Sequence, residues 1–533
     1  MRNPIAHRAT AGAAATVAAL AVLSAPAALA TASAAAPGAP RASGTIAWKP
    51  CPKNDPVEKN RLRTLQCATL RVPLDHARPR GPRITLALTR ARHTAARSQG
   101  IVLLNRGGPG AHGRDMPLLL TKGMPHRVAA AYDWIGFDPR GVGASRPAMV
   151  CDPSFQDPGH PRADTTPANA AEERAWRARA AAYAADCARR YPRLLPHMGT
   201  ADWVRDMDDI RAALGQRKIN YLGYSYGSYL GTEYASRYPD RVRRMVLDSV
   251  VRPSGVWYDA NIDQNVAFQK RIQTYFAWIA RYDAVYHLGA TEQEVAASYA
   301  RARARLKAAP LNGRIGASEL DDVFLSDGYG DYAWPVHAKI LSAYLKGDPK
   351  PLAKAWSRPG FLDQNDYAVY SAVQCRDAAW PRAWRRWHDD SVRLYRAGYT
   401  FETWSNTWYN APCASWRPPQ GPAPRAGAPA RLAPVLLVQG TEDAATPFNG
   451  AVETHRLLPG SRLLVQVGGG NHGVTLSGDR CVDGTVANYL LRGALPKPGA
   501  TCKAPPPPTP DGPAKRVRPA PPGPVSAPVG TRF

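Results

Sequence analysis

Residues 221–231 read YLGYSYGSYLG and place three glycines and two serines within eleven residues. The central GYSYG, residues 223–227, fits the pattern G-x-S-x-G, in which a serine lies on a sharp turn between a strand and a helix. A short apolar run at 218–223 precedes the serine, and residues 228–238 are typical of a helix that Pro239 ends. An ordinary glycine-rich bend is the alternative, because the pattern alone is weak. Ser225 is therefore a candidate nucleophile, and the rest of the chain has to distinguish a nucleophile turn from an ordinary bend.

Strand-like and helical patterns alternate on both sides of this turn. Strands are expected at 101–104, 132–138 and 242–250, and a helix is expected at 201–214, where apolar residues recur at helical spacing. The alternation stops near residue 251, helical stretches such as 264–281 and 291–308 follow, and strands return at 434–439 and 461–467. The sequence therefore predicts an α/β fold with a mostly parallel sheet flanked by helices. Its core comprises residues 45–250 and 431–502, and a mainly helical cap, 251–430, is inserted before the last strands.

Two residues with the chemistry that a serine nucleophile needs follow the last two predicted strands. Asp443 lies in GTEDAATP at 440–447, and His472 lies in GGGNHG at 468–473. A serine hydroxyl needs a base, the base needs an orienting acid, and both are expected in loops at the carboxyl ends of strands. Either residue alone could have only a structural role in its own glycine-rich turn. The order Ser225, Asp443, His472 predicts a catalytic triad, with Glu442 as the rival acid.

An acyl-transfer site also needs donors for the oxyanion that forms during attack. One is expected to be the backbone N–H of Tyr226, directly after the nucleophile. The glycine loop NRGGPG at 105–110 would supply the other, from Gly108 in preference to Gly107. An ordinary tight turn is the alternative interpretation of this loop.

The two ends of the chain have compositions that do not favour a packed core. Residues 1–36 combine a basic start, an alanine-rich apolar run and small residues, which is typical of a secretory signal peptide. An uncleaved membrane anchor is the alternative, and the prolines at 26, 37 and 40 do not favour it. Residues 503–533 are proline-rich and almost without apolar side chains, so a disordered tail is expected. The prediction is a secreted, extracellular protein without a membrane anchor.

The chain has eight cysteines, and an even number in a secreted chain favours disulfide bonds. Their clustering suggests that neighbours pair: Cys51 with Cys67, Cys151 with Cys187, Cys375 with Cys413, and Cys481 with Cys502. Their spacing does not indicate a metal site, and no cofactor is expected. The net charge of +27 comes from arginines spread along the chain without a nucleic-acid-binding motif, so nucleic acid is not an expected partner. The oligomeric state is left open.

The motifs taken together carry a family resemblance. The ordered set NRGGPG at 105–110, DWIGFDPRGVGASRP at 133–147, the segment 206–251, PVLLVQGTEDAATP at 434–447 and GGGNHGV at 468–474 resembles secreted tripeptidyl aminopeptidases. These belong to the proline iminopeptidase-like branch of the α/β-hydrolases. The resemblance covers about residues 45–502, and it implies a helical cap, the triad above and release of short peptides, tripeptides in particular, from free N-termini. Arg106 before GGPG and Glu442 before the triad acid depart from the family pattern.

Substrate recognition is less constrained by the sequence than the mechanism is. A peptidase specific for free N-termini must bind an α-amine, and a carboxylate from the cap could do so. Asp377 is preferred because Cys375 beside it would be anchored; the other candidates are Asp321, Asp322, Asp327 and Asp331. A secreted carboxylesterase or lipase-like hydrolase would use the same triad, and a non-catalytic binding protein on the same scaffold is the second alternative.

Overall fold

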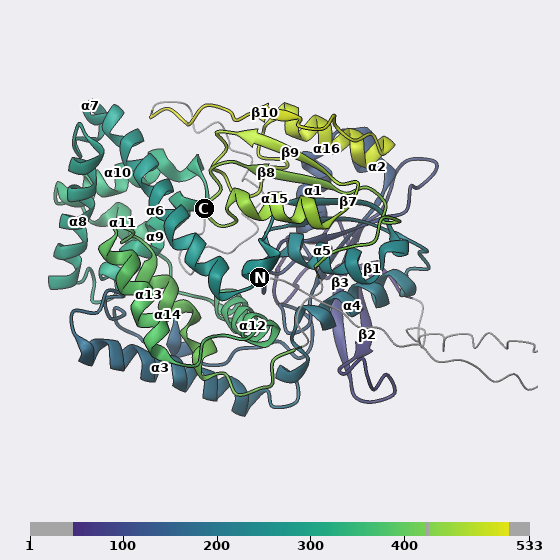
Figure 1. Cartoon of the computed structure of the whole chain (residues 1–533), viewed down its shortest axis with the longest axis horizontal. Coiled ribbons are helices and arrows are strands. Elements are labelled where there is room, and N and C mark those ends of the chain that lie inside the picture. The colour runs from purple at the N-terminus through teal and green to yellow at the C-terminus, as the bar shows by residue number, and fades with distance from the viewer. Residues whose placement is uncertain (1–45, 422–425, 511–533) are drawn as a thin grey trace, which may run out of the picture. The chain divides into compact units, whose positions relative to one another are not determined.

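A sheet whose strands run mostly parallel forms the centre of the molecule (Figure 1). The computed structural model of the chain describes residues 46–421 and 426–510. Within these residues the strands follow the order β1-β2-β3-β5-β4-β6-β7-β8-β9-β10. Pairing is antiparallel from β1 to β3 and between β3 and β5, and parallel from β5 through β4 to β10. The strands are β1 (Lys49–Pro50), β2 (Gln66–Pro73), β3 (Arg83–Ala91), β4 (Ile101–Asn105), β5 (Asp133–Asp138), β6 (Ile219–Tyr224), β7 (Val242–Asp248), β8 (Leu436–Gly440), β9 (Arg462–Val467) and β10 (Thr501–Lys503).

Helices cover both faces of this sheet, because its central strands are apolar on both sides. Successive side chains of a strand point to opposite faces. In β4, Ile101 and Leu103 join one buried apolar cluster, and Val102 and Leu104 join another. The helices that pack on the two faces are α1 (Met116–Gly123), α2 (His126–Ala131), α4 (Thr200–Ala213), α5 (Tyr226–Arg237), α15 (Phe448–Leu457) and α16 (Arg480–Arg492). The predicted sheet covered by helices is confirmed.

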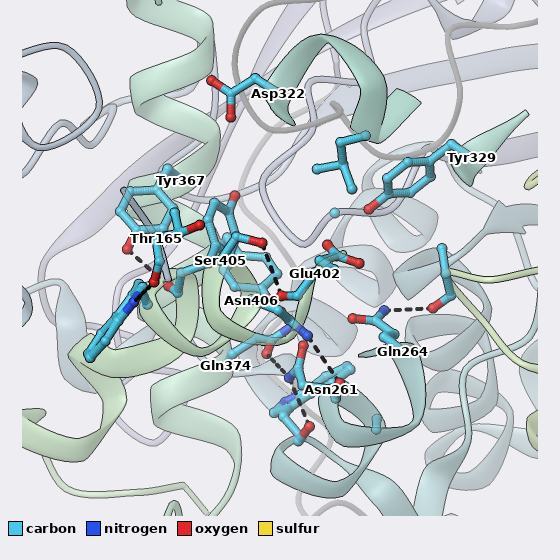
Figure 2. Close-up of a pocket in the computed structure, with 18 of the residues that line it drawn as sticks. Thr165, Asn261, Gln264, Asp322, Tyr329, Tyr367, Gln374, Glu402, Ser405 and Asn406 are labelled. Carbon is cyan, nitrogen blue, oxygen red and sulfur yellow. Dashed lines mark hydrogen bonds between the residues drawn. The ribbon is translucent and has the colours of Figure 1, made fainter. Parts of the chain in front are cut away.

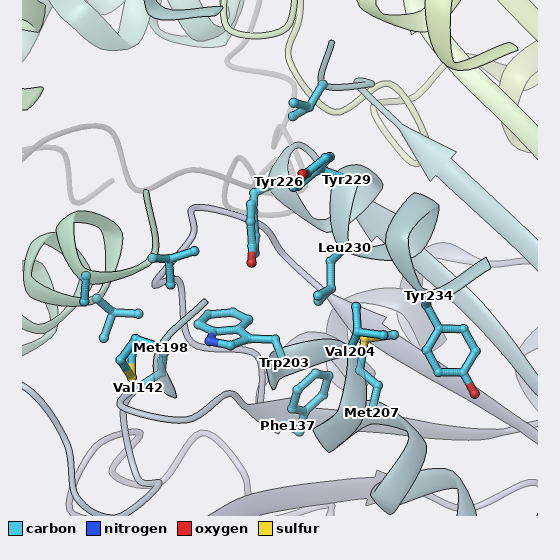
Figure 3. Packing of buried hydrophobic residues seen from close by; sticks show 14 of the residues in the cluster. Phe137, Val142, Met198, Trp203, Val204, Met207, Tyr226, Tyr229, Leu230 and Tyr234 are labelled. Atoms are coloured by element: carbon cyan, nitrogen blue, oxygen red, sulfur yellow. The ribbon is translucent and has the colours of Figure 1, made fainter. Parts of the chain in front are cut away.

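The helix that follows Ser225 is held by close packing. Trp203 and Met207 of α4 belong to the same buried cluster as Leu230 and Tyr226 of α5 (Figure 3). The indole of Trp203 meets the ring of Tyr226 edge to face, with 5.5 Å between ring centroids. Truncating a fully buried tryptophan to alanine costs about 3–5 kcal/mol. The turn before α5 therefore rests on a rigid support.

A helical segment fills the chain between β7 and β8 and lies beside the sheet (Figure 1). We call residues 249–435 the cap. Its helices are α6 (Tyr258–Arg281), α7 (Asp283–Tyr286), α8 (Glu292–Ala308), α9 (Ala317–Tyr329), α10 (Trp334–Leu345), α11 (Lys350–Ala355), α12 (Phe361–Asp377), α13 (Trp384–Arg396) and α14 (Thr403–Asn410). Short 3₁₀ turns lie at Pro153–Phe155, Leu195–His197, Pro239–Arg241, Pro253–Gly255, Asp331–Ala333 and Ala411–Ser415.

One long helix from the first part of the chain joins these cap helices. Helix α3 (Ala170–Arg190) begins at Asn169, whose side chain accepts the N–H groups of residues 171 and 172. It stacks Trp176 on Trp408 of α14, with ring centroids 5.5 Å apart and planes within 10°. Figure 1 shows α3 alongside α13 and α14. The sequence prediction placed the whole of 45–250 in the core, so the structure moves this helix to the cap layer.

The described part of the tail is ordered. Lys503 ends β10, and the Ala504 N–H donates to the Val467 carbonyl at 3.0 Å. Farther on, the indole N–H of Trp278 in α6 donates to the Pro508 carbonyl at 2.9 Å. Residues 503–510 thus run from the sheet to the cap, contrary to the disorder predicted from residue 503. The remainder of the predicted tail, 511–533, and the predicted signal peptide, 1–36, lie outside the described residues.

Four disulfide bonds join neighbouring cysteines along the chain: Cys51–Cys67, Cys151–Cys187, Cys375–Cys413 and Cys481–Cys502. The first two bonds lie before the cap in the sequence, and the third lies within the cap. The fourth joins α16 to β10. Across 46–421 and 426–510, no helix combines the length and the apolar character needed to span a membrane.

Candidate active site

Ser225 occupies the turn between β6 and α5 with φ 56° and ψ −126°. A residue with a side chain adopts this conformation only when its surroundings impose it. The Ser225 N–H donates to the Asp248 carbonyl at 2.9 Å, which ties the turn to β7. A Cβ on Gly223 would lie 2.5 Å from the Gly227 carbonyl oxygen, and a Cβ on Gly227 would lie 2.9 Å from the Asn105 carbonyl oxygen and 2.8 Å from Asn105 Oδ1. Both flanking glycines are therefore required by the close approach of neighbouring backbone.

His472 and Asp443 meet beyond the carboxyl ends of β9 and β8. His472 Nδ1 lies 2.9 Å from Asp443 Oδ2 and 3.0 Å from Oδ1. Asp443 also accepts the N–H groups of Ala445 and Thr446, each at 3.0 Å, and the Thr446 hydroxyl at 2.9 Å. His472 Nε2 is buried and has no hydrogen-bond partner within residues 46–421 and 426–510. An imidazole that donates from Nδ1 to the carboxylate keeps Nε2 as a base.

The end of β7 holds the histidine loop beside the nucleophile turn. Asp248 binds the Ser225 N–H through its carbonyl, while its buried carboxylate accepts the Val474 N–H at 2.9 Å. The hydroxyl of Ser249 accepts the Gly473 N–H at 2.7 Å. Two adjacent residues thus fix both elements of the site to one strand. Sequence reasoning did not select Asp248, because an aspartate at a strand end has no distinctive pattern.

The rival acid points elsewhere. Glu442 is exposed, whereas Asp443 retains only 2% of its accessible surface. The Glu442 carboxylate contacts the hydroxyl of Thr441 at 3.4 Å, within its own turn. The geometry therefore supports Asp443 in the orienting role.

The glycine loop after β4 lies beside the elbow, because β4 pairs with β6 and Gly227 closely approaches Asn105. The Gly107 N–H donates to Asn105 Oδ1 at 3.0 Å, so this donor already has an acceptor. Gly108, with φ 104°, lines the same cavity as Ser225 and Tyr226. The ring of Tyr226 packs in the buried cluster with Trp203, and its hydroxyl lies 2.7 Å from Thr200 Oγ1. This arrangement favours the N–H groups of Gly108 and Tyr226 over Gly107 as oxyanion donors.

Core and cap together enclose a cavity of about 160 Å³ that contains Ser225. Aromatic side chains form much of its wall, among them Phe155, Trp176, Tyr329, Tyr367, Tyr370, Trp408 and Tyr409. Amide side chains interrupt this wall, and Asn406 of α14 donates to the Asn261 carbonyl of α6 at 3.0 Å (Figure 2). The cavity therefore combines apolar surface with groups able to hydrogen-bond an extended peptide.

The model of the alpha/beta hydrolase fold family matches residues 100–478 of the chain. The chain belongs to the α/β-hydrolase fold family. A tripeptidyl aminopeptidase of Streptomyces coelicolor is 43% identical over 474 residues, 86% of this chain and 86% of that protein. The serine protease Hip1 of Mycobacterium tuberculosis is 33% identical over 87% of this chain and 92% of its own length. Carboxylesterase B of the same species is 30% identical over 87% of this chain and 91% of its own. The predicted resemblance is confirmed.

Most carboxyl groups that line the hydrolase's cavity are already paired with an arginine side chain. Asp263 lies 2.9 Å from Arg252, Asp321 lies 2.7 Å from Arg303, and Asp322 pairs with Arg162. Two further carboxyl groups, Glu402 and Asp366, line the cavity and form no ion pair within the described ranges.

Glu402 stands out among these groups by its isolation. Its Oε2 is buried without a hydrogen-bond partner in the described part of the chain. Burial raises the pKa of Glu402 to about 8, since no positive charge offsets the loss of water. Figure 2 shows its carboxyl group between Tyr329 and Asn406. Nothing in the sequence around residue 402 separates this glutamate from the other acids of the cap.

The aspartate preferred from the sequence is used inside the fold. Asp377 accepts the Thr200 N–H at 2.7 Å and hydroxyl at 2.5 Å, and it also meets the Trp257 indole N–H at 3.3 Å. Burial raises its pKa to about 6, and these donors oppose the change. Asp377 does not belong to the cavity wall, so the structure does not favour it for the substrate amine.

The remaining sequence candidates also have partners of their own. Asp327 lies 2.8 Å from His337. Asp331 accepts from the side-chain amide of Asn471 at 3.1 Å. Neither lines the cavity.

Three side-chain groups within the described residues could each offer three close ligand atoms to a metal ion. One contains Cys481 and Cys502, whose sulfur atoms are joined to each other. In the other two, Asp115 and Asp206 are bound by the guanidinium groups of Arg106 and Arg140. These arginines already supply the positive charge, and we assign no metal ligand here.

Proposed function

We propose that the chain is a secreted serine exopeptidase that releases short peptides, tripeptides in particular, from free N-termini. The observation that carries the proposal is one cavity lined by the strained Ser225 and by the carboxyl of Glu402, which has no ion pair among the described residues. The oriented pair of His472 and Asp443 lies beyond the carboxyl ends of the same parallel sheet. The similarity to a tripeptidyl aminopeptidase along 86% of the chain supports the same reaction. Residues 1–36 are proposed as the signal peptide, and the N-terminal mass of the exported protein tests this.

The mechanism assigns one step to each group. His472 Nε2 takes the proton of Ser225 as the hydroxyl attacks the peptide carbonyl, and Asp443 stabilises the imidazolium. The N–H groups of Gly108 and Tyr226 bind the oxyanion. The imidazolium then protonates the leaving amine, and a water molecule, activated by the same imidazole, releases the acyl peptide from Ser225.

Glu402 is proposed to bind the α-ammonium group of the substrate. The cavity provides no cation for this carboxyl, and burying an isolated charge is unfavourable. An ammonium group supplies the missing partner, favours the ionised carboxylate and forms charge-assisted hydrogen bonds. An acetylated N-terminus has neither charge nor the donors, so the same carboxyl rejects it.

A carboxylesterase is the second candidate, favoured by the 30% identity to carboxylesterase B. It would need only the triad and the aromatic wall of the cavity. A panel of four substrates separates the two functions: a tripeptide anilide with a free N-terminus, its N-acetyl form, the matching dipeptide anilide and a short acyl ester. We expect the free tripeptide anilide to be hydrolysed at least about 100-fold faster than its acetyl form, because losing a buried charged partner costs about 3 kcal/mol or more.

Ser225→Ala serves as the control for the assignment of the nucleophile. It should abolish hydrolysis of every substrate while the unfolding temperature changes little. Turnover of the ester without any turnover of free peptides would refute the peptidase and leave the esterase. Activity that persists in Ser225→Ala would refute both.

A further inference from the structure

The cavity contains a second unpaired carboxyl, Asp366, which the proposed amine site does not use. Asp366 lies on α12 beside Asn365, whose amide donates to the carbonyls of Gly141 and Met149 at 2.8 and 2.7 Å. These bonds tie this turn of α12 to the core. On its other side, a Cβ on Gly110 would lie 2.4 Å from Asp366 Oδ1. The carboxyl is therefore held directly against the loop that supplies the oxyanion donor.

Asp366 and Glu402 occupy different places in the cavity. Burial, together with the nearby charge of Asp363, raises the pKa of Asp366 well above its usual range, and Arg106 opposes this. Burial alone raises the pKa of Glu402. Asp366 lies on α12 against Gly110, whereas Glu402 directly precedes α14. If Glu402 binds the α-amine, Asp366 is left for another group of the substrate.

The position of Asp366 suits a substrate cation. While it is unpaired, burial favours its neutral, protonated form. A substrate cation next to Asp366 would favour the ionised carboxylate, and the resulting pair is neutral, so it does not oppose the negative charge that develops on the substrate oxygen beside Gly108. Asp366 shares this cavity with Ser225 and Gly108 and lies against Gly110, so it belongs to the part of the wall next to the glycine loop.

We propose that Asp366 is a specificity-determining residue that binds a cationic side chain, of lysine or arginine, on the residue whose carbonyl Ser225 attacks. The proposal rests on the proposed function, because it names a substrate class for the same site. It assigns the two unpaired carboxyls to two different positive charges of one peptide.

Matched peptides test the assignment. Ala-Ala-Lys and Ala-Ala-norleucine p-nitroanilides differ only in the side-chain amine, and Ala-Lys-Ala p-nitroanilide moves that amine by one residue. For the wild type we expect kcat/KM to favour Ala-Ala-Lys over Ala-Ala-norleucine by about tenfold, equivalent to about 1.4 kcal/mol. Asp366→Asn should bring the ratio close to one and leave the rate for Ala-Lys-Ala unchanged relative to Ala-Ala-norleucine.

Asp263→Asn is the matched control, since Asp263 lines the same cavity and is already paired with Arg252. It should preserve the ratio of Ala-Ala-Lys to Ala-Ala-norleucine. The unfolding temperature of each variant shows whether it folds. If Asp366→Asn lowers the rates of all free-amine peptides equally, or if the ratio survives in this variant, the proposal is wrong.

Failure of the peptidase function gives a different result. If no free-amine peptide anilide is hydrolysed, the same comparison is made with the p-nitrophenyl esters of Nα-acetyl-lysine and Nα-acetyl-norleucine. A preference for the lysine ester that Asp366→Asn removes would support the subsite on an esterase. Equal rates for the two esters would overturn it.

Discussion

Replacing Glu402 with glutamine should stabilise the fold and, at the same time, lower the activity on peptides with a free N-terminus. Glu402→Gln keeps the size of the side chain and removes the charge that lacks a partner in the empty cavity. If the carboxyl is present for the substrate amine, its isolation destabilises the free enzyme. The variant therefore separates the cost to folding from the gain in binding.

The magnitude follows from proton linkage. The pKa of Glu402 is about 8 in the fold, against an ordinary value of 4.5. An acid with a raised pKa imposes no cost on folding below its unfolded pKa, and the cost grows as the pH rises from the unfolded to the folded value and is complete above it. The difference of about 3.5 units sets an upper limit of about 4.8 kcal/mol at pH 9, and partial exposure reduces it, so we expect about 1–3 kcal/mol.

Two assays check this prediction. The unfolding temperature of Glu402→Gln should equal that of the wild type near pH 4.5 and exceed it by about 1–3 °C at pH 9, since about 1 kcal/mol corresponds to about 1 °C in a chain of this length. At pH 7.5 the variant should lose about 100-fold in kcat/KM for a free tripeptide anilide, the cost of about 3 kcal/mol for an unpaired ammonium group, and little for the acetylated form.

Glu442→Gln is the control, because it makes the same chemical change at an exposed position. It should alter neither the unfolding temperature nor the rates. A stability difference that does not grow with pH, or an equal loss on free and acetylated substrates, would contradict the assignment of Glu402.

Three further changes have definite expected outcomes. Gly227→Ala places a Cβ 2.8 Å from Asn105 Oδ1 and should displace the glycine loop. We expect kcat, measured in steady-state assays, to fall by about 100-fold, which is the effect of losing one oxyanion donor. Asp248→Asn leaves one N–H of the histidine loop without an acceptor, and we expect kcat to fall about 10–100-fold with KM unchanged. Truncation after Lys503 removes the acceptor of the buried Trp278 indole, so the unfolding free energy measured in urea should fall by about 1–3 kcal/mol while the activity is retained.

The fold and the nucleophile turn could be predicted because their causes are local. Glycines at 223 and 227 are needed within two residues of Ser225, and the apolar runs of β4, β6 and β8 are continuous because both faces of the sheet are covered. The proximity of His472 to Asp443 also follows from strand order, since each residue comes just after its own strand. The roles of these residues stay predictions until they are tested.

Substrate recognition could not be predicted because it depends on distant partners. Asp322 and Glu402 are both acids of the cap, and the sequence does not distinguish their surroundings. Arg162, 160 residues away in the chain, pairs with Asp322, whereas no described residue pairs with Glu402. Asp377 was preferred for its anchored position, and that same anchoring by Thr200 and Trp257 occupies its carboxyl. Helix α3 was not recognised as a cap helix, because its stacking on Trp408 is visible only in three dimensions.

The order of the disulfides has a consequence for how the chain can be made. Each bond closes before the next cysteine pair begins, with separations of 16, 36, 38 and 21 residues. Eight cysteines allow on the order of 100 pairings. If the chain is secreted as proposed and emerges N-terminus first from an export channel, each cysteine meets its correct partner before any later cysteine competes. Oxidation would then keep pace with translocation, and a shuffling isomerase would have little to correct.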